Sequence, residues 1–317
     1  MGNQFVFTLE PTISVVPFKD ATVRVIATGP NNEDLCRSCV AIDKSGSINV
    51  GNVPYKNWGK YAPNIVVSAK RLMGASISDP QVQKMKADKD MYPYGISKMS
   101  GGTDESVVVI MNGNEYTPEQ ISAEILRQLK NDASVKLGGE VTHAVITVPA
   151  YFNEKQKSAT RKAAELAGLK VQRLLAEPTA AAISYGADKM AADEDKIFLV
   201  YDFGGGTFDL SILVASGGNF IESGTGGDRW LGGDDIDRLL SEYVLSEAGK
   251  ANNVDIHEVI NALPDRKKFG FQGELKKEIE SVKKALSQSE SATISIYDRL
   301  ENEDGDPIDI EVKLTRE

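Results

Sequence analysis

The sequence contains few of the residues that bind transition metals or form cross-links: two cysteines and two histidines among 317 residues. The cysteines form one motif, Cys36-Arg-Ser-Cys39, and the histidines His143 and His257 are isolated, so the further ligands that a zinc site needs are missing. A redox pair would need a thioredoxin-like βαβ context, which the flanking sequence does not show. We interpret Cys36 and Cys39 as incidental thiols, His143 as a strand-end residue and His257 as a helix-surface residue.

Long hydrophobic runs and an excess of positive charge are also missing. No segment approaches the roughly 20 apolar residues of a membrane-spanning helix, and no basic region followed by an apolar core predicts a secretory signal. The formal net charge of −10 argues against nonspecific binding to nucleic acid or acidic lipid. The hydrophobic content of 41% is ordinary, and 317 residues suffice for two domains with their own cores. The composition predicts a cytoplasmic, globular protein.

A glycine-rich turn lies between two apolar, strand-like runs in residues 200–213. Consecutive glycines allow backbone N–H groups to converge on an anion, where a Cβ would block close approach. A threonine in the turn offers a hydroxyl to a phosphate oxygen or to water, and a carboxylate at the strand end suits a hydrated magnesium ion. An ordinary hairpin is the alternative, because short glycine patterns often occur by chance. The turn consists of Gly204, Gly205, Gly206 and Thr207, with Asp202 and Asp209 on either side.

The spacing of apolar and turn residues predicts an α/β organisation in the first part of the chain. Thr117-Pro-Glu-Gln120 has the residues of a capping box, and a helix is predicted from there to about Asp132. Residues 141–148 are apolar enough for a buried parallel strand. We also expect strands in 5–28 and on to about residue 53, irregular structure over 54–105, and a helix over 154–167.

The second part of the chain is predicted to combine a hairpin, helices and two terminal strands. The acidic turn 301–306 is interpreted as a solvated hairpin loop, because its carboxylates lack the ligand order of a calcium loop. The predicted elements are a hairpin over 197–214, a glycine-rich segment over 217–233, helices over 234–250 and 275–287, and strands over 292–297 and 308–315.

Several motifs accompany the glycine-rich turn: Pro149-Ala-Tyr-Phe-Asn153, Glu177-Pro-Thr179 and Leu231-Gly-Gly-Asp-Asp235. In this order and approximate spacing, the sequence resembles the 70-kDa heat-shock protein (DnaK-type) chaperones from about residue 60 to the C-terminus. A sugar kinase or an actin shares the fold plan but is not expected to carry this combination. The resemblance implies an α/β, actin-like (ribonuclease H-like) ATPase fold, with two lobes around a nucleotide cleft and incomplete at the C-terminus.

The resemblance also implies a division of the chain into two lobes. Lobe I is expected over residues 1–190 and lobe II over 191–317, with residues 187–195 as the connection between them. The expected core of lobe I is about 1–38 and 116–190, with an inserted subdomain over about 39–115, and that of lobe II is about 191–235, with a subdomain over about 236–310.

The resemblance implies that the chain binds ATP or ADP with Mg²⁺. It also assigns catalytic roles to five residues. Lys70 would reach the phosphate site as a point charge on the transferring phosphoryl group, although it could instead be a surface lysine in a basic dipeptide. Glu177 would orient water from across the cleft. Thr207 would contact the terminal phosphate or the attacking water, and Asp202 and Asp209 would organise magnesium and water, with Asp202 binding the ion through water.

The nucleoside is assigned to one helical stripe, because residues three and four positions apart share a helix face. A solvated charged face is the alternative interpretation. The implied nucleotide-binding residues outside the glycine-rich turn are Thr12, Gly232, Gly233, Glu280, Lys283, Lys284 and Ser287.

An allosteric relay is implied at Pro149, which would sense the nucleotide state, and at Lys157, where the family usually has arginine. Lysine cannot reproduce the bidentate fork of arginine, so a weaker relay is expected. A J-domain co-chaperone and a nucleotide-exchange factor are the implied partners, and unfolded peptide would be bound only through a domain absent from this sequence.

Two departures from the family pattern weaken the predicted ATPase activity. The first phosphate turn has Thr8 in place of an aspartate, Glu10 in place of a glycine and Pro11 in place of a threonine; only the hydroxyls of Thr12 and Ser14 are kept. The sequence also stops before the second adenosine turn of the family. The chain is therefore expected to be either an expressed fragment or a naturally truncated relative. Incomplete sheets expose strand edges, so self-association is possible. A non-hydrolysing scaffold that binds nucleotide weakly or not at all is therefore the alternative function.

Overall fold

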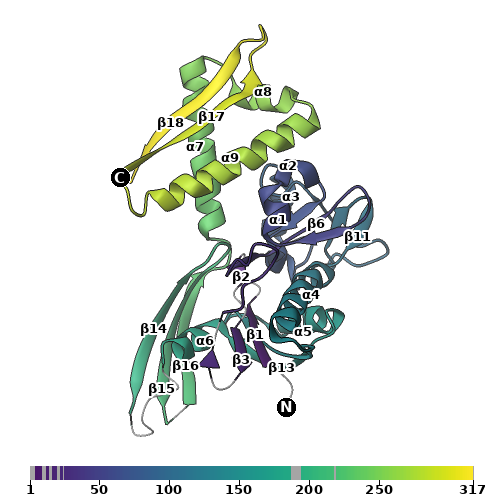
Figure 1. The fold of residues 1–317 in the computed structure, drawn as a ribbon, viewed down its shortest axis with the longest axis vertical. Helices are drawn as coiled ribbons and strands as arrows, with labels where there is room; N and C mark the ends of the chain where they lie inside the picture. Colours follow the sequence, from purple (N-terminus) through teal and green to yellow (C-terminus); the bar gives the residue numbers. More distant parts are fainter. Residues whose placement is uncertain are drawn as a thin grey trace.

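The computed structural model describes residues 4–8, 12–13, 16–19, 22–23, 25–186, 194–217 and 219–316, with backbone only before residue 25. The described part is a mixed α/β arrangement with several small sheets. Figure 1 shows an elongated molecule in which the C-terminal helices and strands lie at one end and the N-terminal strands at the other. No helix in these ranges is both long enough and apolar enough to span a membrane.

A five-stranded sheet with the order β13-β12-β1-β3-β4 forms the base of the N-terminal part. The strand β12 (His143–Val148) pairs in parallel with β1 (Gln4–Thr8) and with β13 (Lys170–Ala176), which confirms the predicted buried parallel strand. The antiparallel strands β3 (Val16–Lys19) and β4 (Thr22–Val23) complete the sheet.

Two helices with capping boxes follow the predicted pattern. The helix α4 (Pro118–Leu137) begins after Thr117, whose hydroxyl accepts from the N–H of Gln120 at 3.2 Å. It continues five residues beyond the predicted end and stops at Gly138, whose φ of 66° ends the helix in a left-handed conformation. The helix α5 (Glu154–Leu166) lies against α4 and agrees with the predicted range.

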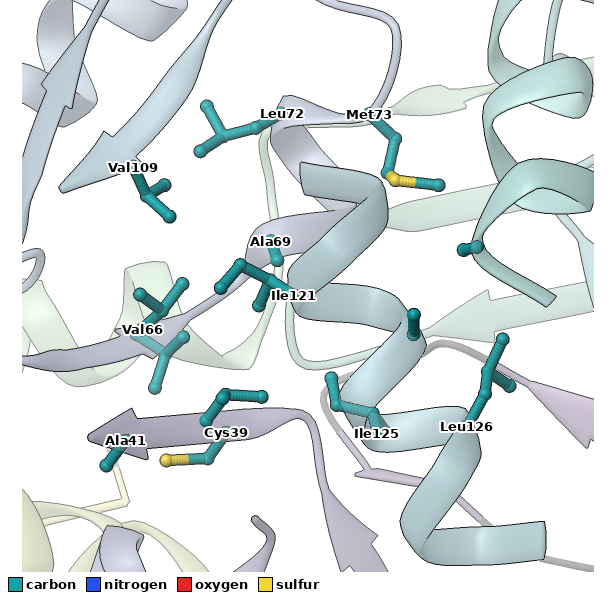
Figure 2. Close-up of a cluster of buried hydrophobic side chains, with 14 of the residues drawn as sticks. Cys39, Ala41, Val66, Ala69, Leu72, Met73, Val109, Ile121, Ile125 and Leu126 are labelled. Carbon is teal, nitrogen blue, oxygen red and sulfur yellow. The ribbon is translucent and has the colours of Figure 1, made fainter. Parts of the chain in front are cut away.

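The largest hydrophobic core includes residues between Ile26 and Leu169. In Figure 2, Ile121 and Ile125 of α4 point toward Cys39 of β6 (Cys39–Ile42) and Val66 of β8 (Ile65–Val67). Cys36 and Cys39 are buried, free thiols, and burial raises the pKa of Cys36 to about 12, in keeping with incidental thiols.

The prediction of irregular structure over residues 54–105 was wrong. This region contains several elements only three to eight residues long, too short for sequence periodicity to reveal, and burial in the main core stabilises them. The elements in and around this region are β5 (Cys36–Arg37), β7 (Ile48–Val50), α1 (Asn52–Lys56), α2 (Trp58–Tyr61), η1 (Ala69–Leu72), α3 (Pro80–Ala87), β9 (Gly95–Ser97), β10 (Val108–Met111) and β11 (Asn114–Tyr116).

A second core lies between three helices and the terminal hairpin, from Val244 to Leu314. The strands β17 (Ser291–Glu301) and β18 (Pro307–Thr315) confirm the predicted terminal strands and their acidic turn. The helix α7 (Gly233–Asn252) agrees with its prediction. The helix α8 (Ile256–Ala262), whose range was not predicted, carries the exposed His257, which confirms His257 as a helix-surface residue.

The helix α9 (Asp265–Ala285) begins ten residues before its predicted start. Its first half contains Gly270 and Gly273, which disfavour a helix in sequence terms. Both face α2: a Cβ on Gly59 would lie 2.7 Å from the Cα of Gly270, and a Cβ on Gly273 would lie 2.7 Å from the Cβ of Trp58. Close packing between the two cores therefore requires glycine at 59 and at 273, whereas a Cβ on Gly270 itself would meet no atom within 4 Å.

The predicted hairpin is confirmed as β14 (Lys196–Phe203) and β15 (Phe208–Ser216). The following glycine-rich segment supplies a third strand, β16 (Asn219–Asp228), which the sequence did not predict. The helix α6 (Glu177–Ser184) packs on one face of this sheet through Ala182 and Leu213. Most of the predicted connection over 187–195 lies outside the described residues.

Candidate functional site

The glycine-rich turn is a tight hairpin tip between β14 and β15. The N–H of Gly204 donates to the carbonyl of Thr207 at 2.9 Å, and Gly206 and Thr207 are buried. Asp202 and Asp209 lie directly opposite each other in the antiparallel ladder. The turn therefore brings two carboxylates and one hydroxyl to the same end of the sheet.

The second glycine motif packs against this turn at the start of α7. The N–H of Gly233 donates to the carbonyl of Gly204 at 3.0 Å, and the N–H of Asp234 donates to that of Gly205 at 2.8 Å. A Cβ on Gly232 would lie 2.4 Å from the carbonyl oxygen of Gly205, so only glycine fits there. The two motifs form one structure, which we call the glycine cradle: residues 204–207 and 232–233.

Lys70 and Glu177 meet near the glycine cradle although they come from distant elements. Lys70 lies in η1, and Glu177 is the first residue of α6. The Lys70 Nζ lies 3.0 Å from the Glu177 Oε1, and the two side chains are only 11% and 9% exposed. Lys70 is thus a largely buried residue, not a surface lysine in a basic dipeptide.

Arg71 fixes the position of the glycine cradle, a role that the sequence did not predict. Its guanidinium donates to the carbonyl of Gly206 from two nitrogens, at 3.1 and 2.6 Å, and to Asp235 Oδ2 at 2.8 Å. Its third contact is with the hydroxyl of Tyr92, at 2.9 Å. In the sequence, the only indication of a role for Arg71 is its position next to Lys70. That position does not reveal that Arg71 and Lys70 contact different partners.

A cavity of about 210 Å³ lies beside these residues. Lys70, Arg71 and Thr207 line it, together with the aromatic side chains of Phe152 and Trp230. Asp202, Asp209 and Glu177 do not line this cavity; Glu177 is connected to it through Lys70. The cavity thus offers to a ligand three cationic groups, Lys70, Arg71 and Arg229, together with several hydroxyls, aromatic surface and the carboxylate of Asp79.

Two members of the predicted nucleoside stripe contact residues of the N-terminal part or the glycine cradle. Glu280 forms an ion pair with Arg37 and accepts from the hydroxyl of Tyr55 at 3.3 Å. Lys283 donates to the carbonyl of Gly233 at 2.9 Å and lies 2.7 Å from Asp237 Oδ1. The stripe therefore bridges α9 to the rest of the site, and Arg37 and Tyr55 are partners that the sequence did not predict.

The electrostatics of Glu280 follow from its neighbours. Burial opposes its ionisation, but the hydrogen bond from Lys284 and the charge of Arg37 outweigh this effect and lower the pKa of Glu280 to about 2. Lys284 is exposed and lies 2.6 Å from Glu280. Ser287 was wrongly placed on this helix: α9 ends at Ala285, and Ser287 is exposed beyond it.

The predicted relay residues occupy the connection from β12 and the start of α5. Pro149 is buried, and its carbonyl accepts from the N–H of Phe152 at 3.1 Å. Lys157 forms an ion pair with Glu154 one turn earlier in the same helix, at 3.0 Å. These contacts place Pro149 next to the cavity wall at Phe152, and the relay itself stays a prediction.

The divergent first turn can be located only in part. Thr8 ends β1, and Thr12 of β2 (Thr12–Ile13) pairs through its backbone with Arg37, the partner of Glu280. Glu10, Pro11 and Ser14 lie outside the described residues. Their effect on phosphate binding stays a prediction.

The chemistry of the donor set fits a magnesium nucleotide. No group of three or more His, Cys, Asp or Glu side chains in the described ranges could hold a metal ion. Mg²⁺ in nucleotide sites commonly binds one or two carboxylates and keeps several waters. Asp202 and Asp209 could supply such carboxylates, and the glycine cradle is of the kind that accepts phosphate.

The fold and this site are those of a mixed α/β protein with a candidate phosphate-binding site. In a comparison with protein families, residues 9–317 match the family described as Hsp70 protein. The chain therefore belongs to the Hsp70 family, which confirms the predicted resemblance. This family implies an actin-like ATPase fold, and the mixed α/β arrangement is consistent with it. Its members bind ATP or ADP with Mg²⁺ and generally work with J-domain co-chaperones and nucleotide-exchange factors.

Proposed function

We propose that this chain is the nucleotide-binding part of an ATP-dependent protein-folding chaperone, in which ATP binding and hydrolysis open and close two lobes. The observation that carries the proposal is the convergence of Lys70, Glu177 and the glycine cradle. A buried lysine paired with a glutamate beside a glycine-rich turn has groups that phosphoryl transfer needs: a positive charge, a carboxylate that can orient water and, in Thr207, a hydroxyl for a phosphate oxygen.

Each residue of the site has a separate role in this proposal. Lys70 supplies positive charge at the transferring phosphoryl group, and Glu177 holds Lys70 in place and orients water. Thr207 offers its hydroxyl to a phosphate oxygen or to the attacking water. Asp202 and Asp209 hold the hydrated cation, and Mg²⁺ when bound would neutralise phosphate charge.

The proposed lobes are residues 1–190 and 191–317. Two separate hydrophobic cores, one before residue 170 and one after residue 243, support this division. Several polar contacts link the two parts, among them those of Arg37 with Glu280, Arg71 with Asp235, and Gln272 with Asp90. Polar contacts of this kind can break and re-form during lobe movement at a smaller cost than apolar packing. The proposed cellular location is the cytoplasm.

The alternative function is a scaffold that no longer hydrolyses ATP. The observation that favours it is that Glu280 and Lys283, which the resemblance assigns to the nucleoside, have protein partners in Arg37 and Asp237. A ligand in this stripe would have to compete with those ion pairs. The altered first turn, with Glu10 and Pro11, points in the same direction.

Calorimetric titration of Mg-ATP into the purified chain separates the two functions. We expect binding in the micromolar range or tighter, about −8 kcal/mol or more favourable. Lys70→Ala and Thr207→Ala should weaken it, whereas Lys98→Ala, which removes an exposed lysine paired with Asp104, should not. The absence of both heat and thermal stabilisation at millimolar ATP would reject the ATPase proposal and leave the scaffold.

A further inference from the structure

The cavity beside the glycine cradle has two ends that differ in exposure. Lys70 and Thr207 line it where it meets the glycine cradle, and they are only 11% and 8% exposed. Arg229, which directly follows β16, lines it as well and is 48% exposed. We call the part at Lys70 and Thr207 the inner end and the part at Arg229 the outer end. The volume of about 210 Å³ is several times the roughly 30 Å³ of one water molecule in the liquid, so a phosphate group at the inner end fills only part of it.

The outer end contains hydrogen-bond donors that the protein itself does not use. Asn153 Oδ1 accepts from the N–H of Gln156 at 2.9 Å, and Gln156 Oε1 accepts from the N–H of Asn153 at 3.1 Å, which forms the capping box of α5. Both residues line the cavity. The capping box uses only their side-chain oxygens, and no residue in the described part of the chain accepts from their amide nitrogens. Both amides can therefore donate to an anion in the cavity.

Gly74 brings the start of α5 to the same cavity as the cations. It follows the η1 helix that carries Lys70 and Arg71, and its φ of 63° favours glycine. A Cβ on Gly74 would lie 3.2 Å from Gln156 Cγ and 3.3 Å from the Gln156 nitrogen. The close approach that glycine allows therefore places the Gln156 amide and the two cations around one space.

Arg229 supplies positive charge at the outer end, and its protein partner holds it weakly. Its guanidinium Cζ lies 6.0 Å from the ring centroid of Trp230, and the Cζ of Arg71 lies 5.5 Å from the same centroid. Arg229 Nη2 is 3.8 Å from Asp79 Oδ2, near the upper limit for an ion pair, and the other oxygen of Asp79 accepts from the N–H of Gln81. Exposed ion pairs contribute little to stability, so an anion can replace Asp79 as the partner of Arg229.

We propose that the outer end of the cavity is a second phosphate site, which binds inorganic phosphate while a nucleotide occupies the inner end. Arg229 contributes charge and the amides of Asn153 and Gln156 contribute hydrogen bonds to the bound ion. The occupant of the inner end rests on the proposed function, in which the terminal phosphate of ATP lies at Thr207. In that function, the second site receives the inorganic phosphate that hydrolysis of ATP releases.

The charges along the cavity suit a site that holds phosphate and then lets it leave. Lys70, Arg71 and Arg229 line the same space and offset the mutual repulsion of two phosphate groups. Asp79 competes with phosphate for Arg229, which keeps the affinity low. A site on an exit path must bind well enough to be entered and weakly enough to be left. We therefore expect weak, reversible binding.

The fluorescence of Trp230 tests the second site directly, because its ring lies next to Arg229 and the chain has only one other tryptophan. Inorganic phosphate is titrated into the full chain, with sodium chloride of equal ionic strength as the reference. The emission should change with a dissociation constant on the order of 1 mM. Trp230→Phe should remove this signal, and calorimetry of the same titration gives a second measurement of binding.

Two substitutions at the outer end should act in opposite directions. Arg229→Gln should raise the dissociation constant for phosphate at least tenfold, because it removes the charge. Asp79→Asn should lower it at least threefold, because it removes the competing carboxylate while asparagine still caps α3. The matched control is Arg299→Gln, which changes an exposed arginine paired with Glu274 on β17 and should bind phosphate as the wild type does.

A non-hydrolysable Mg-ATP analogue separates the two ends of the cavity. Phosphate should still bind when the analogue is saturating, with a dissociation constant raised less than tenfold. Loss of phosphate binding under these conditions would overturn the proposal, because phosphate would then occupy the place of the terminal phosphate. A wild-type chain that gives neither heat nor a fluorescence change would also overturn it, as would equal affinities in the wild type and Arg229→Gln. If calorimetry shows that the analogue itself does not bind, the proposed function fails, and the phosphate titrations still decide whether the second site exists.

Discussion

Lys70 and Glu177 form a nearly buried ion pair, with 3.0 Å between Nζ and Oε1, although they are 107 residues apart in the sequence. Burial of two charges costs desolvation energy that their attraction barely repays, so such a pair contributes little to stability by itself. Loss of one partner is different, because it leaves the other charge buried. The pair therefore permits stability and activity to be separated by mutation.

We expect Lys70→Met to reduce the free energy of unfolding by about 3 kcal/mol, because Glu177 loses its cationic partner. The double variant Lys70→Met, Glu177→Gln should recover most of this loss. ATP hydrolysis should remain about 100-fold lower or more in both variants, because neither restores the positive charge. Urea unfolding and single-turnover hydrolysis measure the two effects, and a double variant with wild-type activity would exclude Lys70 from catalysis.

The close contact between the two glycine motifs leads to a second prediction. A Cβ at Gly232 would lie 2.4 Å from the Gly205 carbonyl oxygen and 2.6 Å from the Gly206 nitrogen, both rigid backbone atoms. We expect Gly232→Ala to destabilise the chain by about 2 kcal/mol and to weaken ATP binding at least tenfold, because the turn must move.

Gly139→Ala is the control for this substitution, because a Cβ there would meet no atom within 4 Å. It should retain wild-type unfolding and ATP affinity. Chemical denaturation and calorimetry provide the measurements. Wild-type ATP affinity in Gly232→Ala would show that the cradle does not position the ligand.

Local sequence signals predicted the parts of the fold that depend on neighbouring residues. The capping box at Thr117 and the buried strand ending at Val148 are determined within a few residues, and both were predicted. The start of α9 was not predicted, because Gly270 and Gly273 weaken the helical pattern, and glycine at 273 is required only by the approach of Trp58. The start of this helix is determined by packing between segments that are distant in the sequence.

The candidate site also has one part that the local sequence predicts and one part that depends on contacts between distant residues. The glycine-rich turn at Thr207 is a local motif, so its shape followed from the sequence. Arg71 and Arg37 act on partners 135 and 243 residues away, and nothing in their own neighbourhood indicates those partners. Periodicity also extended the α9 stripe to Ser287, because the pattern of residues does not show that the helix ends at Ala285.

The Glu280 ion pairs lead to a prediction about pH. The pKa of Glu280 in the folded chain is lowered to about 2 from an ordinary value of 4.5 by Lys284 and Arg37, despite burial. A carboxylate whose pKa is lower in the folded state stabilises that state above its unfolded pKa and loses this contribution as the pH falls through its folded pKa. Glu280→Gln should therefore lower the free energy of unfolding at pH 7 by on the order of 2 kcal/mol.

The difference between wild type and Glu280→Gln should stay constant from pH 7 to about pH 5 and then shrink steadily toward pH 2, since the unfolded wild type takes up a proton that the folded chain does not. Urea unfolding at pH 7, 5, 4 and 3 measures this difference in the free energy of unfolding. Glu242→Gln is the control, because Glu242 pairs with Arg238 on the exposed side of α7, where an ion pair contributes little. A difference that is as large at pH 3 as at pH 7 would show that the mutation acts through packing, and that the Arg37 pair does not hold α9 against the N-terminal part by charge.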